Sequence, residues 1–447
     1  MNDDSPKLLS KDPLEDEIYR EIIRGKNIIL HGIGGTGKTF TTKRILKRLI
    51  KDQFNFACTA MTGIATLNLN DPENSIMCST LHRWAGIGTG QSSVDSLLAR
   101  IHRDFRMKTN WKSTQILFID EFSMLGLSLF EKLEELGRKI RKDDRPFGGL
   151  QIVVIGDVLQ LPPVKDDPAF LSEVWTDKMN FTPFYFYTPK RYDDEKYFSL
   201  LCRLREGKVK QEDIQSLTKR AEAYEKYIKQ EKKGLILIKP TILYPKKVDV
   251  DSYNLEQLKE LDGQEYIFEA KDGFVAFSKT AKADFYMTKL DDAIPQTIIL
   301  KKGALVMCKF NIDVARGLVN GSRGIITEIS EENVVVKFTN GIEEKIDSVT
   351  WEFKDKEGKS YRNQIPFILA YASTIHKSQG LTLDHAIIDS GYDIFTSGQA
   401  YVALSRVRNM DSLLLREFVP SSIMINKEAL KYNNQLIKQE IKRRENE

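Results

Sequence analysis

Short apolar runs alternate with helical patterns over the first third of the chain. The runs lie at residues 27–30, 55–59, 115–119 and 151–155. This alternation is typical of a parallel sheet flanked by helices. Polar residues follow two of the runs, as Asp120-Glu121 and Gly156-Asp157. Because open α/β sheets bind ligands at the carboxyl ends of their strands, the pattern predicts an α/β lobe with a site at that edge.

A second α/β pattern appears later and is interrupted. We expect strands at residues 235–244 and 364–372, and between them short β-like runs with two Asn-Gly turns, at Asn320-Gly321 and Asn340-Gly341. Asn-Gly between apolar runs is a strong hairpin signal. We therefore expect a small β-barrel inserted into a second lobe. The Lys- and Glu-rich stretch 207–233 indicates a solvated helix.

Residues 32–39 complete the phosphate-binding pattern G-x-x-x-x-G-K-[ST] directly after the first apolar run. In such a loop the backbone N–H groups converge on phosphate oxygens, the lysine reaches the β- and γ-phosphates, and the hydroxyl binds Mg²⁺. A helix over residues 40–49 would aim its positive N-terminus at the phosphates. An ordinary glycine-rich turn is the alternative. The expected nucleotide contacts are Gly32, Gly34, Gly35, Thr36, Gly37, Lys38 and Thr39.

The acidic pair after the third run suits the second half of a phosphate-splitting site. Asp120 would hold the metal ion together with Thr39, and Glu121 would orient and deprotonate the attacking water. The alternative is an acidic pair that stabilises the positive end of a helix.

A third candidate follows the fourth run. Pro162-Pro163 forms a rigid segment that ends regular secondary structure, and we expect it to leave Gln160 on an exposed turn. Its amide both donates and accepts, so it can sense a γ-phosphate. A rigid turn with a solvated glutamine is the alternative.

Charge and cysteine content limit the kinds of partner, metal site and cell compartment that fit the chain. The 447 residues hold 67 Lys and Arg against 63 Asp and Glu, a net charge of +4, so a nucleic-acid surface would have to be a local patch. The four cysteines have no C-x-x-C spacing, which disfavours both zinc and a disulfide framework. No run reaches the ~18 apolar residues that a membrane span requires. We expect an intracellular protein without a membrane partner.

Six segments occur in the order found in superfamily 1 helicases. They are the phosphate loop and residues 59–63, 120–124, 156–164, 374–380 and 401–406. Residues 121–141 are similar to the segment that distinguishes the Pif (petite integration frequency) family from its RecD-like relatives. The chain therefore resembles the Pif family over residues 20–415, nearly its whole length.

The resemblance implies two RecA-like lobes, with ATP and Mg²⁺ in the cleft between them and a Src-homology-3-like barrel in the second lobe. The first lobe would span residues 1–180, with an excursion at about 68–112. The second would span residues 181–263 and 364–447, and the barrel 264–363. The family translocates 5′ to 3′ on single-stranded DNA and unwinds duplexes, with roles in replication, repair, recombination and telomere maintenance.

The resemblance also assigns residues around the nucleotide. Arg191 and Arg406 become arginine fingers that stabilise the transferring phosphoryl group, and Gly380 approaches the nucleotide. Tyr192 stands where the family usually has Gln, so a surface salt bridge is the alternative for Arg191. Residues 9–15 lack the family's adenine-reading Gln, which leaves adenine selectivity open.

The segments around residues 59–63 and 374–378 would contact the DNA strand. The predicted DNA-binding residues are Thr59, Met61, Thr62, Gly63, His82, Trp84, Thr374, His376, Lys377 and Ser378. Hydroxyls and cations suit phosphate and sugar oxygens, and aromatic faces suit bases. For the threonines the alternative is helix N-capping, and for Trp84 a place in the core.

Three function classes fit these motifs. The first is an ATP-driven 5′-to-3′ DNA helicase that acts on single-stranded and on tailed or forked duplex DNA and is able to work as a monomer. The second is a DNA-dependent ATPase or loader that separates no duplex. The third is a P-loop kinase or metabolic enzyme, whose turnover would not depend on nucleic acid. RNA as the strand stays open, because backbone contacts discriminate it poorly.

Overall fold

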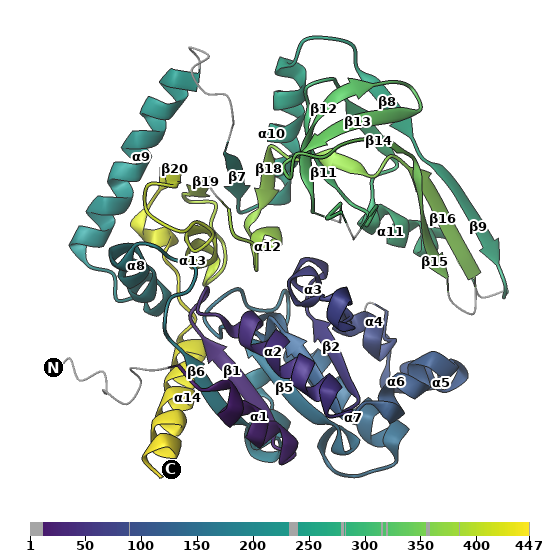
Figure 1. Cartoon of the computed structure of the whole chain (residues 1–447), viewed down its shortest axis with the longest axis vertical. Coiled ribbons are helices and arrows are strands. Elements are labelled where there is room, and N and C mark those ends of the chain that lie inside the picture. The colour runs from purple at the N-terminus through teal and green to yellow at the C-terminus, as the bar shows by residue number, and fades with distance from the viewer. Residues whose placement is uncertain are drawn as a thin grey trace. The chain divides into compact units, whose positions relative to one another are not determined.

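A computed structural model describes residues 12–88, 90–231, 240–278, 281, 283–313, 316–318, 321–354, 358–383 and 385–446. The chain divides into two compact units (Figure 1). The first unit combines Met1–Leu235 with Ile375–Glu447, and the second is Ile236–Thr374.

The first unit is built on a six-stranded, all-parallel sheet in the order β3-β2-β4-β5-β1-β6. Every residue of β1 and β4 is buried, which is why both strands read as continuous apolar runs. The four predicted runs are four of these strands. The strands are β1 (Ile28–Gly32), β2 (Phe56–Ala60), β3 (Cys78–Thr80), β4 (Ile116–Asp120), β5 (Gln151–Gly156) and β6 (Thr182–Phe186).

Two of the first unit's helices, α2 and α14, pack against this sheet. In α2 the buried positions Ile45, Leu46 and Leu49 recur with helical spacing and join the core beside β1. Helix α14 lies along β6 and is yellow in Figure 1. The long helices are α1 (Glu15–Ile23), α2 (Lys38–Lys51), α5 (Val94–Arg103), α6 (Phe105–Ser113), α7 (Leu127–Arg141), α8 (Glu195–Glu206), α9 (Gln211–Glu231) and α14 (Lys427–Glu445).

The remaining α-helices and strands of this unit are short. They are the helices α3 (Gly63–Leu69), α4 (Leu81–Ala85), α12 (Ile375–Ser378) and α13 (Gln399–Leu404) and the parallel strands β19 (Ala386–Ser390) and β20 (Leu413–Phe418). The segment predicted as an excursion holds α4, α5 and α6. It also contributes β3 to the main sheet, where Cys78 pairs with Cys58.

The second unit is rich in antiparallel strands. It contains a five-stranded sheet in the order β14-β13-β12-β11-β17, a three-stranded sheet β15-β16-β9 and a pair β10-β8. Helices α10 (Lys247–Glu260) and α11 (Ala283–Ala293) and a parallel pair, β7 (Thr241–Tyr244) with β18 (Ala372–Thr374), complete it. Among the residues described, these sheets do not close into a ring, so the predicted barrel is not confirmed.

The antiparallel strands are β8 (Tyr266–Glu269), β9 (Lys271–Ala276), β10 (Thr297–Leu300), β11 (Leu305–Cys308), β12 (Arg323–Ile329), β13 (Asn333–Phe338), β14 (Glu343–Asp347), β15 (Val349–Lys354), β16 (Gly358–Gln364) and β17 (Phe367–Leu369). The hairpin predicted at Asn340-Gly341 is confirmed: it joins β13 to β14, and Gly341 has a φ of +86°. Asn320 and residues 235–239 lie outside the described residues.

The expected single strand over residues 364–372 is wrong. Gln364 ends β16, after which β17 pairs antiparallel with β11 and β18 pairs parallel with β7. Pro366 separates the first two segments, and a proline cannot donate to a strand ladder. One apolar run therefore serves three strands.

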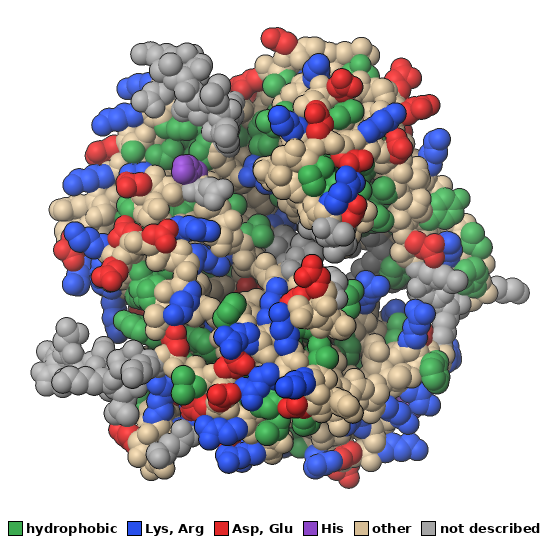
Figure 2. Space-filling model, viewed as in Figure 1, with side chains coloured by type: hydrophobic (Ala, Val, Ile, Leu, Met, Phe, Trp, Pro, Cys, Tyr) green, Lys and Arg blue, Asp and Glu red, His purple; other side chains and the backbone are tan. Residues whose placement is uncertain are grey.

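Charge is mixed over the face shown in Figure 2, where Lys and Arg side chains are interspersed with Asp and Glu. This distribution agrees with the near-balanced composition and marks no broad basic surface on that face. No helix among the residues described is both long and apolar enough to cross a membrane.

Candidate active site

The phosphate loop joins β1 to α2 at the carboxyl edge of the sheet. Gly32 has a φ of +139° and Gly37 a φ of +91°, backbone conformations that glycine adopts readily. A Cβ at Gly32 would collide with the Phe186 carbonyl oxygen. Lys38 is buried, and its Nζ donates to the carbonyls of Gly32 and Ile33, each at 2.8 Å. The loop is thus a narrow cradle of backbone groups with one cation folded into it.

Burial lowers the pKa of Lys38 to about 8, while the neighbouring carboxylates of Asp157, Glu121 and Asp120 oppose that shift. The acidic residues predicted for the site therefore lie close enough to Lys38 to interact with it. Thr36 is buried and donates from Oγ1 to the Ile33 carbonyl at 2.8 Å.

The acidic pair stands where β4 ends. Asp120 Oδ1 accepts the Glu121 backbone N–H at 2.9 Å, and burial, followed by the Glu121 charge, raises the pKa of Asp120 to about 8. Glu121 has a φ of +56° and a ψ of +44°, in the left-handed region that non-glycine residues rarely occupy. Such strained residues cluster at functional sites, where the surrounding structure holds them.

The donor set fits a magnesium nucleotide better than a metal held by protein alone. No group of three or more His, Cys, Asp or Glu side chains gathers around a common point in the described residues. Mg²⁺ is usually bound by one or two carboxylates together with substrate phosphates. Asp120, at the end of β4, and the Thr39 hydroxyl, which follows the glycine cradle in sequence, are the residues that would supply the protein's part of such a site.

Gln160 lies against the phosphate loop, but the prediction of an exposed turn is wrong. The residue is only 7 % exposed, and its backbone N–H closes a turn onto the Asp157 carbonyl at 3.0 Å. A Cβ at Gly34 would lie 3.1 Å from its Nε2. Its Oε1 has no hydrogen-bond partner among the described residues. The amide is therefore placed beside the loop, in a buried position.

Asp157 anchors a buried polar network behind the loop. Arg205, from α8, donates to both oxygens of Asp157 at 2.7–3.0 Å, and both side chains are fully buried. The Tyr401 hydroxyl donates to Asp157 Oδ2 at 3.0 Å and accepts the Gly34 N–H at 3.0 Å. Arg205 also donates to Asn433 of α14 at 3.0 Å. Elements far apart in the sequence thereby hold the loop in place.

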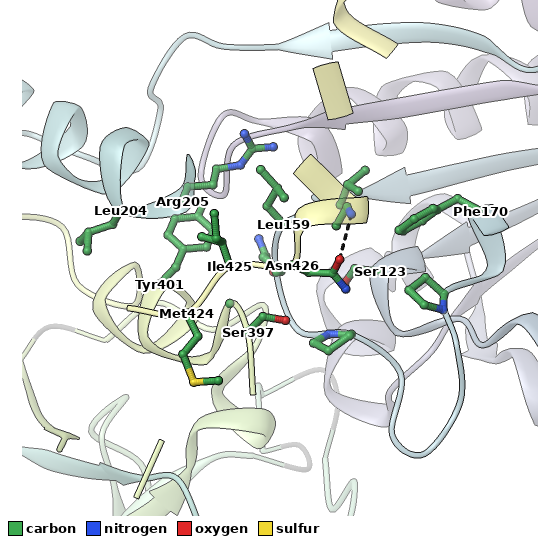
Figure 3. A pocket seen from close by; sticks show the side chains of 16 residues that line it. Ser123, Leu159, Phe170, Leu204, Arg205, Ser397, Tyr401, Met424, Ile425 and Asn426 are labelled. Carbon is green, nitrogen blue, oxygen red and sulfur yellow. Dashed lines mark hydrogen bonds between the residues drawn. The ribbon is translucent and has the colours of Figure 1, made fainter. Parts of the chain in front are cut away.

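A small pocket borders this network. Arg205 and Tyr401 line one side, Ser123 and Phe170 line the other, and Leu159 lies between them (Figure 3). Because Gln160 also belongs to the lining, the pocket adjoins the segment predicted to sense a γ-phosphate.

The two predicted arginine fingers converge on Ser405. Arg191 donates from Nη1 to the Ser405 carbonyl at 3.1 Å, a contact to a carbonyl and not to a carboxylate. Arg406 is 1 % exposed and donates from Nη2 to Ser405 Oγ at 2.6 Å and from Nη1 to the carbonyls of Ser378 and Leu381 at 3.2 Å. Burial, followed by the nearby charge of Arg191, lowers the pKa of Arg406 to about 10.

Two of the predicted DNA-binding threonines use their hydroxyls internally. Thr59 is fully buried and donates to the Phe118 carbonyl at 2.6 Å, so the prediction that its side chain contacts DNA is wrong. Thr62 caps α3 by accepting the Ala65 N–H at 3.2 Å, as the N-capping alternative requires. Met61 is partly buried against the core, whereas Gly63 is exposed.

Trp84 takes the core alternative. It is 6 % exposed, and its ring centroid lies 4.8 Å from that of Trp111 within the core of the first unit. The indole face is covered, so the prediction that it stacks on a base is wrong. His82 is only partly buried.

The segment 374–380 is divided between the two units. Thr374 is buried and ends β18 in the second unit, while the residues that follow open the first unit's last portion. In α12, Lys377 is exposed, Ser378 is buried, and the partly exposed His376 stacks on Phe395 at 5.9 Å between ring centroids. Burial lowers the pKa of His376.

Gly380 lies close to the acidic pair. Its φ is +82°, and a Cβ there would lie 3.5 Å from Glu121 Oε1. The preceding residue, Gln379, donates directly to Glu121. It lies inside the motif at residues 374–380, but sequence reasoning predicted no role for it. Tyr401 was missed in the same way. Arg205 sits in an ordinary amphipathic helix and carries no local signal.

His31 offers a test of the buried site through pH. It is fully buried, neither ring nitrogen has a hydrogen-bond partner among the described residues, and burial lowers its pKa to about 3. In the unfolded chain, His31 takes up a proton as the pH falls through about 6.5, whereas in the folded protein it stays neutral to a much lower pH. Below about pH 6.5 protonation therefore favours the unfolded state, and the free energy of unfolding decreases as the pH falls toward the folded pKa. We expect the free energy of unfolding to fall from pH 7 to 5.5 by about 1 kcal/mol more in the wild type than in His31→Phe. Urea denaturation at both pH values measures this difference, and parallel pH dependences would contradict it.

The comparisons with known proteins agree with this geometry. The family model for PIF1-like helicase matches residues 13–180, and the model for the DNA helicase Pif1 2B domain matches residues 290–329 in the second unit. The ATP-dependent DNA helicase Pif1 of Bdellovibrio bacteriovorus is 30% identical over 417 residues, which cover 92% of this chain and 89% of that protein. The chain belongs to the PIF1-like helicase family.

Other PIF1-like helicases show the same relation. The ATP-dependent DNA helicase PIF1 of Xenopus laevis is 35% identical over 97% of this chain, which spans 66% of that protein, just under two thirds. The crystal structure of Pif1 helicase from Candida albicans superimposes with a TM-score of 0.82 at 29% identity, covering 94% of this chain and 98% of that one. Bacteroides Pif1 bound to single-stranded DNA has a TM-score of 0.69 at 25% identity and covers 96% and 98%. These structures support the RecA-like character of the parallel α/β sheets.

Proposed function

We propose that this PIF1-like protein is an ATP-dependent DNA helicase that translocates 5′ to 3′ on single-stranded DNA and unwinds duplexes in replication, repair or recombination. The observation that carries the proposal is the convergence in one compact unit of a phosphate loop, an acidic pair and two arginines that meet at Ser405. Relatives named ATP-dependent DNA helicases, and a Bacteroides relative solved with single-stranded DNA, support it.

The proposed chemistry is attack of a water molecule on the γ-phosphorus of ATP, which breaks the bond to the β,γ-bridging oxygen and releases ADP and phosphate. A bound Mg²⁺ would neutralise part of the phosphate charge. Lys38 would exchange its hydrogen bonds to loop carbonyls for phosphate oxygens, and Thr39 and Asp120 would hold the metal ion. Glu121 would orient the attacking water and accept its proton. Arg191 and Arg406 would stabilise the charge that develops on the transferring group, which requires Arg406 to release the Ser378 and Leu381 carbonyls.

The strand would be held by residues of the segments around α3, α4 and α12. The remaining candidates are Met61, Thr62, Gly63, His82, Thr374, His376, Lys377 and Ser378. We also propose the lobe division 1–180, then 181–263 with 364–447, and that the five-stranded antiparallel sheet belongs to a Src-homology-3-like insert within residues 264–363.

The first test is the rate of ATP hydrolysis with and without single-stranded DNA. We expect DNA to raise kcat by about tenfold or more. The reason is that charged side chains such as Arg191 and Arg406 stabilise the transition state only when they are aligned with the transferring phosphoryl group. A rate that DNA does not change would contradict the coupling and favour a P-loop enzyme of another kind. Strand displacement on a duplex with a 5′ tail, compared with one carrying a 3′ tail, then tests unwinding and its direction. Hydrolysis without displacement on either substrate would leave a DNA-dependent ATPase or loader.

A further inference from the structure

Gln379 holds the side chain predicted to be the general base. Its Nε2 donates to Glu121 Oε2 at 3.0 Å, and the two residues are 258 positions apart in the chain. Gln379 is 1 % exposed, so the hydrogen bond is shielded from water. Its other amide atom, Oε1, is buried without a hydrogen-bond partner among the residues described. A buried acceptor without a partner costs free energy, and such groups in native proteins call for an explanation such as a role in catalysis.

The hydrogen bond from Gln379, which we call the clamp, offsets strain at Glu121 and restricts its carboxylate. The left-handed backbone of Glu121, with a φ of +56°, costs free energy that neighbouring contacts must offset. General-base catalysis depends on holding the carboxylate within hydrogen-bond reach of the water that it deprotonates. An amide donor on one oxygen fixes the carboxylate and leaves the other oxygen available for the water.

The turn that carries Gln379 also contacts the arginine finger. The carbonyls of Ser378 and Leu381, one on each side of Gln379 and Gly380, both accept from Arg406 Nη1 at 3.2 Å. Residues 378–381 therefore touch both catalytic groups, the base through a side chain and the arginine through the backbone. The same turn directly continues α12, whose His376 and Lys377 are candidate strand contacts.

We propose that Gln379 is the positioning residue that aligns Glu121 for hydrolysis, and that the turn 378–381 transmits strand binding on α12 to the base. The inference deepens the proposed function and rests on it. Strand binding that shifts α12 moves Gln379 with it, because Gln379 follows the helix immediately and its backbone N–H returns to the His376 carbonyl at 3.4 Å.

The experiment measures steady-state ATP hydrolysis of the full chain with and without saturating oligothymidine. Gln379→Leu removes the amide at similar volume and should lower the DNA-stimulated kcat by about tenfold or more, with the KM for ATP changed less than about twofold. The basal kcat should also fall, because the hydrogen bond to Glu121 is present without DNA. It should fall by less than the stimulated kcat, so the ratio of stimulated to basal rate decreases as well. Gln379→Glu is the second variant, to be used if Gln379→Leu does not fold. It keeps the shape of the side chain, removes the donor and places two carboxylates together, so we expect a comparable loss of kcat.

Two controls separate positioning from general damage. In a Glu121→Gln background, Gln379→Leu should change the residual rate by less than about twofold, because a residue that acts through Glu121 has nothing left to position. Asn68→Ala removes a hydrogen bond of 3.2 Å to the Gly380 carbonyl but leaves the Glu121 contact, and should keep most of the stimulated rate.

Three results would overturn the inference: an unchanged kcat, a loss confined to KM, or an equal loss in the Glu121→Gln background. An equal fall of kcat with and without DNA would overturn the transmission through α12. If the wild-type rate does not respond to DNA, the proposed function fails, and the basal kcat of Gln379→Leu still tests the clamp on Glu121.

Discussion

Lys38→Ala should abolish ATP hydrolysis, with a loss of at least about 100-fold in kcat/KM. Lys38 is the cation folded into the phosphate cradle, and its Nζ already lies 2.8 Å from two carbonyls of the loop. Removing it deletes the charge that would meet the β- and γ-phosphates and leaves those carbonyls without their donor. Phosphate release from ATP, measured with saturating oligothymidine, checks the expected loss.

Lys47→Ala is the matched control for this prediction. Lys47 is on the same helix, 44% exposed, and pairs with Asp71 on the surface at 3.0 Å. Exposed pairs contribute little to stability, so this variant should retain nearly the wild-type rate. If Lys38→Ala keeps wild-type activity while remaining folded, the phosphate loop is not the nucleotide site.

The parts of the fold that the sequence predicted are those with a local signal. Strands β1 and β4 are buried on both faces, so they stand out as apolar runs, and the loop and acidic pair follow them directly. Strand β3 has only three residues, all partly exposed, and leaves no such run. Strand β6 begins Thr182-Pro183, and a proline in a run argues against a strand by local rules.

The errors within the site come from contacts between distant segments. Gln160 was expected in solvent because two prolines follow it, yet Asp157 and the phosphate loop enclose it. Trp84 is covered by Trp111, which lies on another helix. Arg205 is fully buried, which is rare for an arginine without a charged partner, and Asp157 is that partner. Residue types and their spacing indicate which chemical groups stand at these positions. They do not indicate which distant residues those groups contact in the folded chain.

Glu121→Gln should retain nucleotide binding and lose turnover. The substitution keeps the volume of the side chain and an oxygen that can accept from Gln379 Nε2, which lies 3.0 Å away in the wild type. It removes the basic oxygen that takes the proton from water, and general-base groups contribute about 10²- to 10⁴-fold to a rate. We therefore expect kcat to fall by about 10²-fold or more, while the Kd of a fluorescent ATP analogue changes less than about twofold.

Glu131→Gln separates this effect from a simple loss of charge. Glu131 is exposed on α7 of the same unit and accepts from Ser172 Oγ at 2.8 Å, so its substitution should leave kcat close to the wild-type value. Normal turnover in Glu121→Gln would remove Glu121 as the base and leave its strained backbone and its buried contact with Gln379 as structural features. Loss of nucleotide binding together with turnover would instead assign Glu121 to holding the nucleotide. Only retained binding with lost turnover supports the base, because the proton acceptor is needed after the nucleotide is bound and not before.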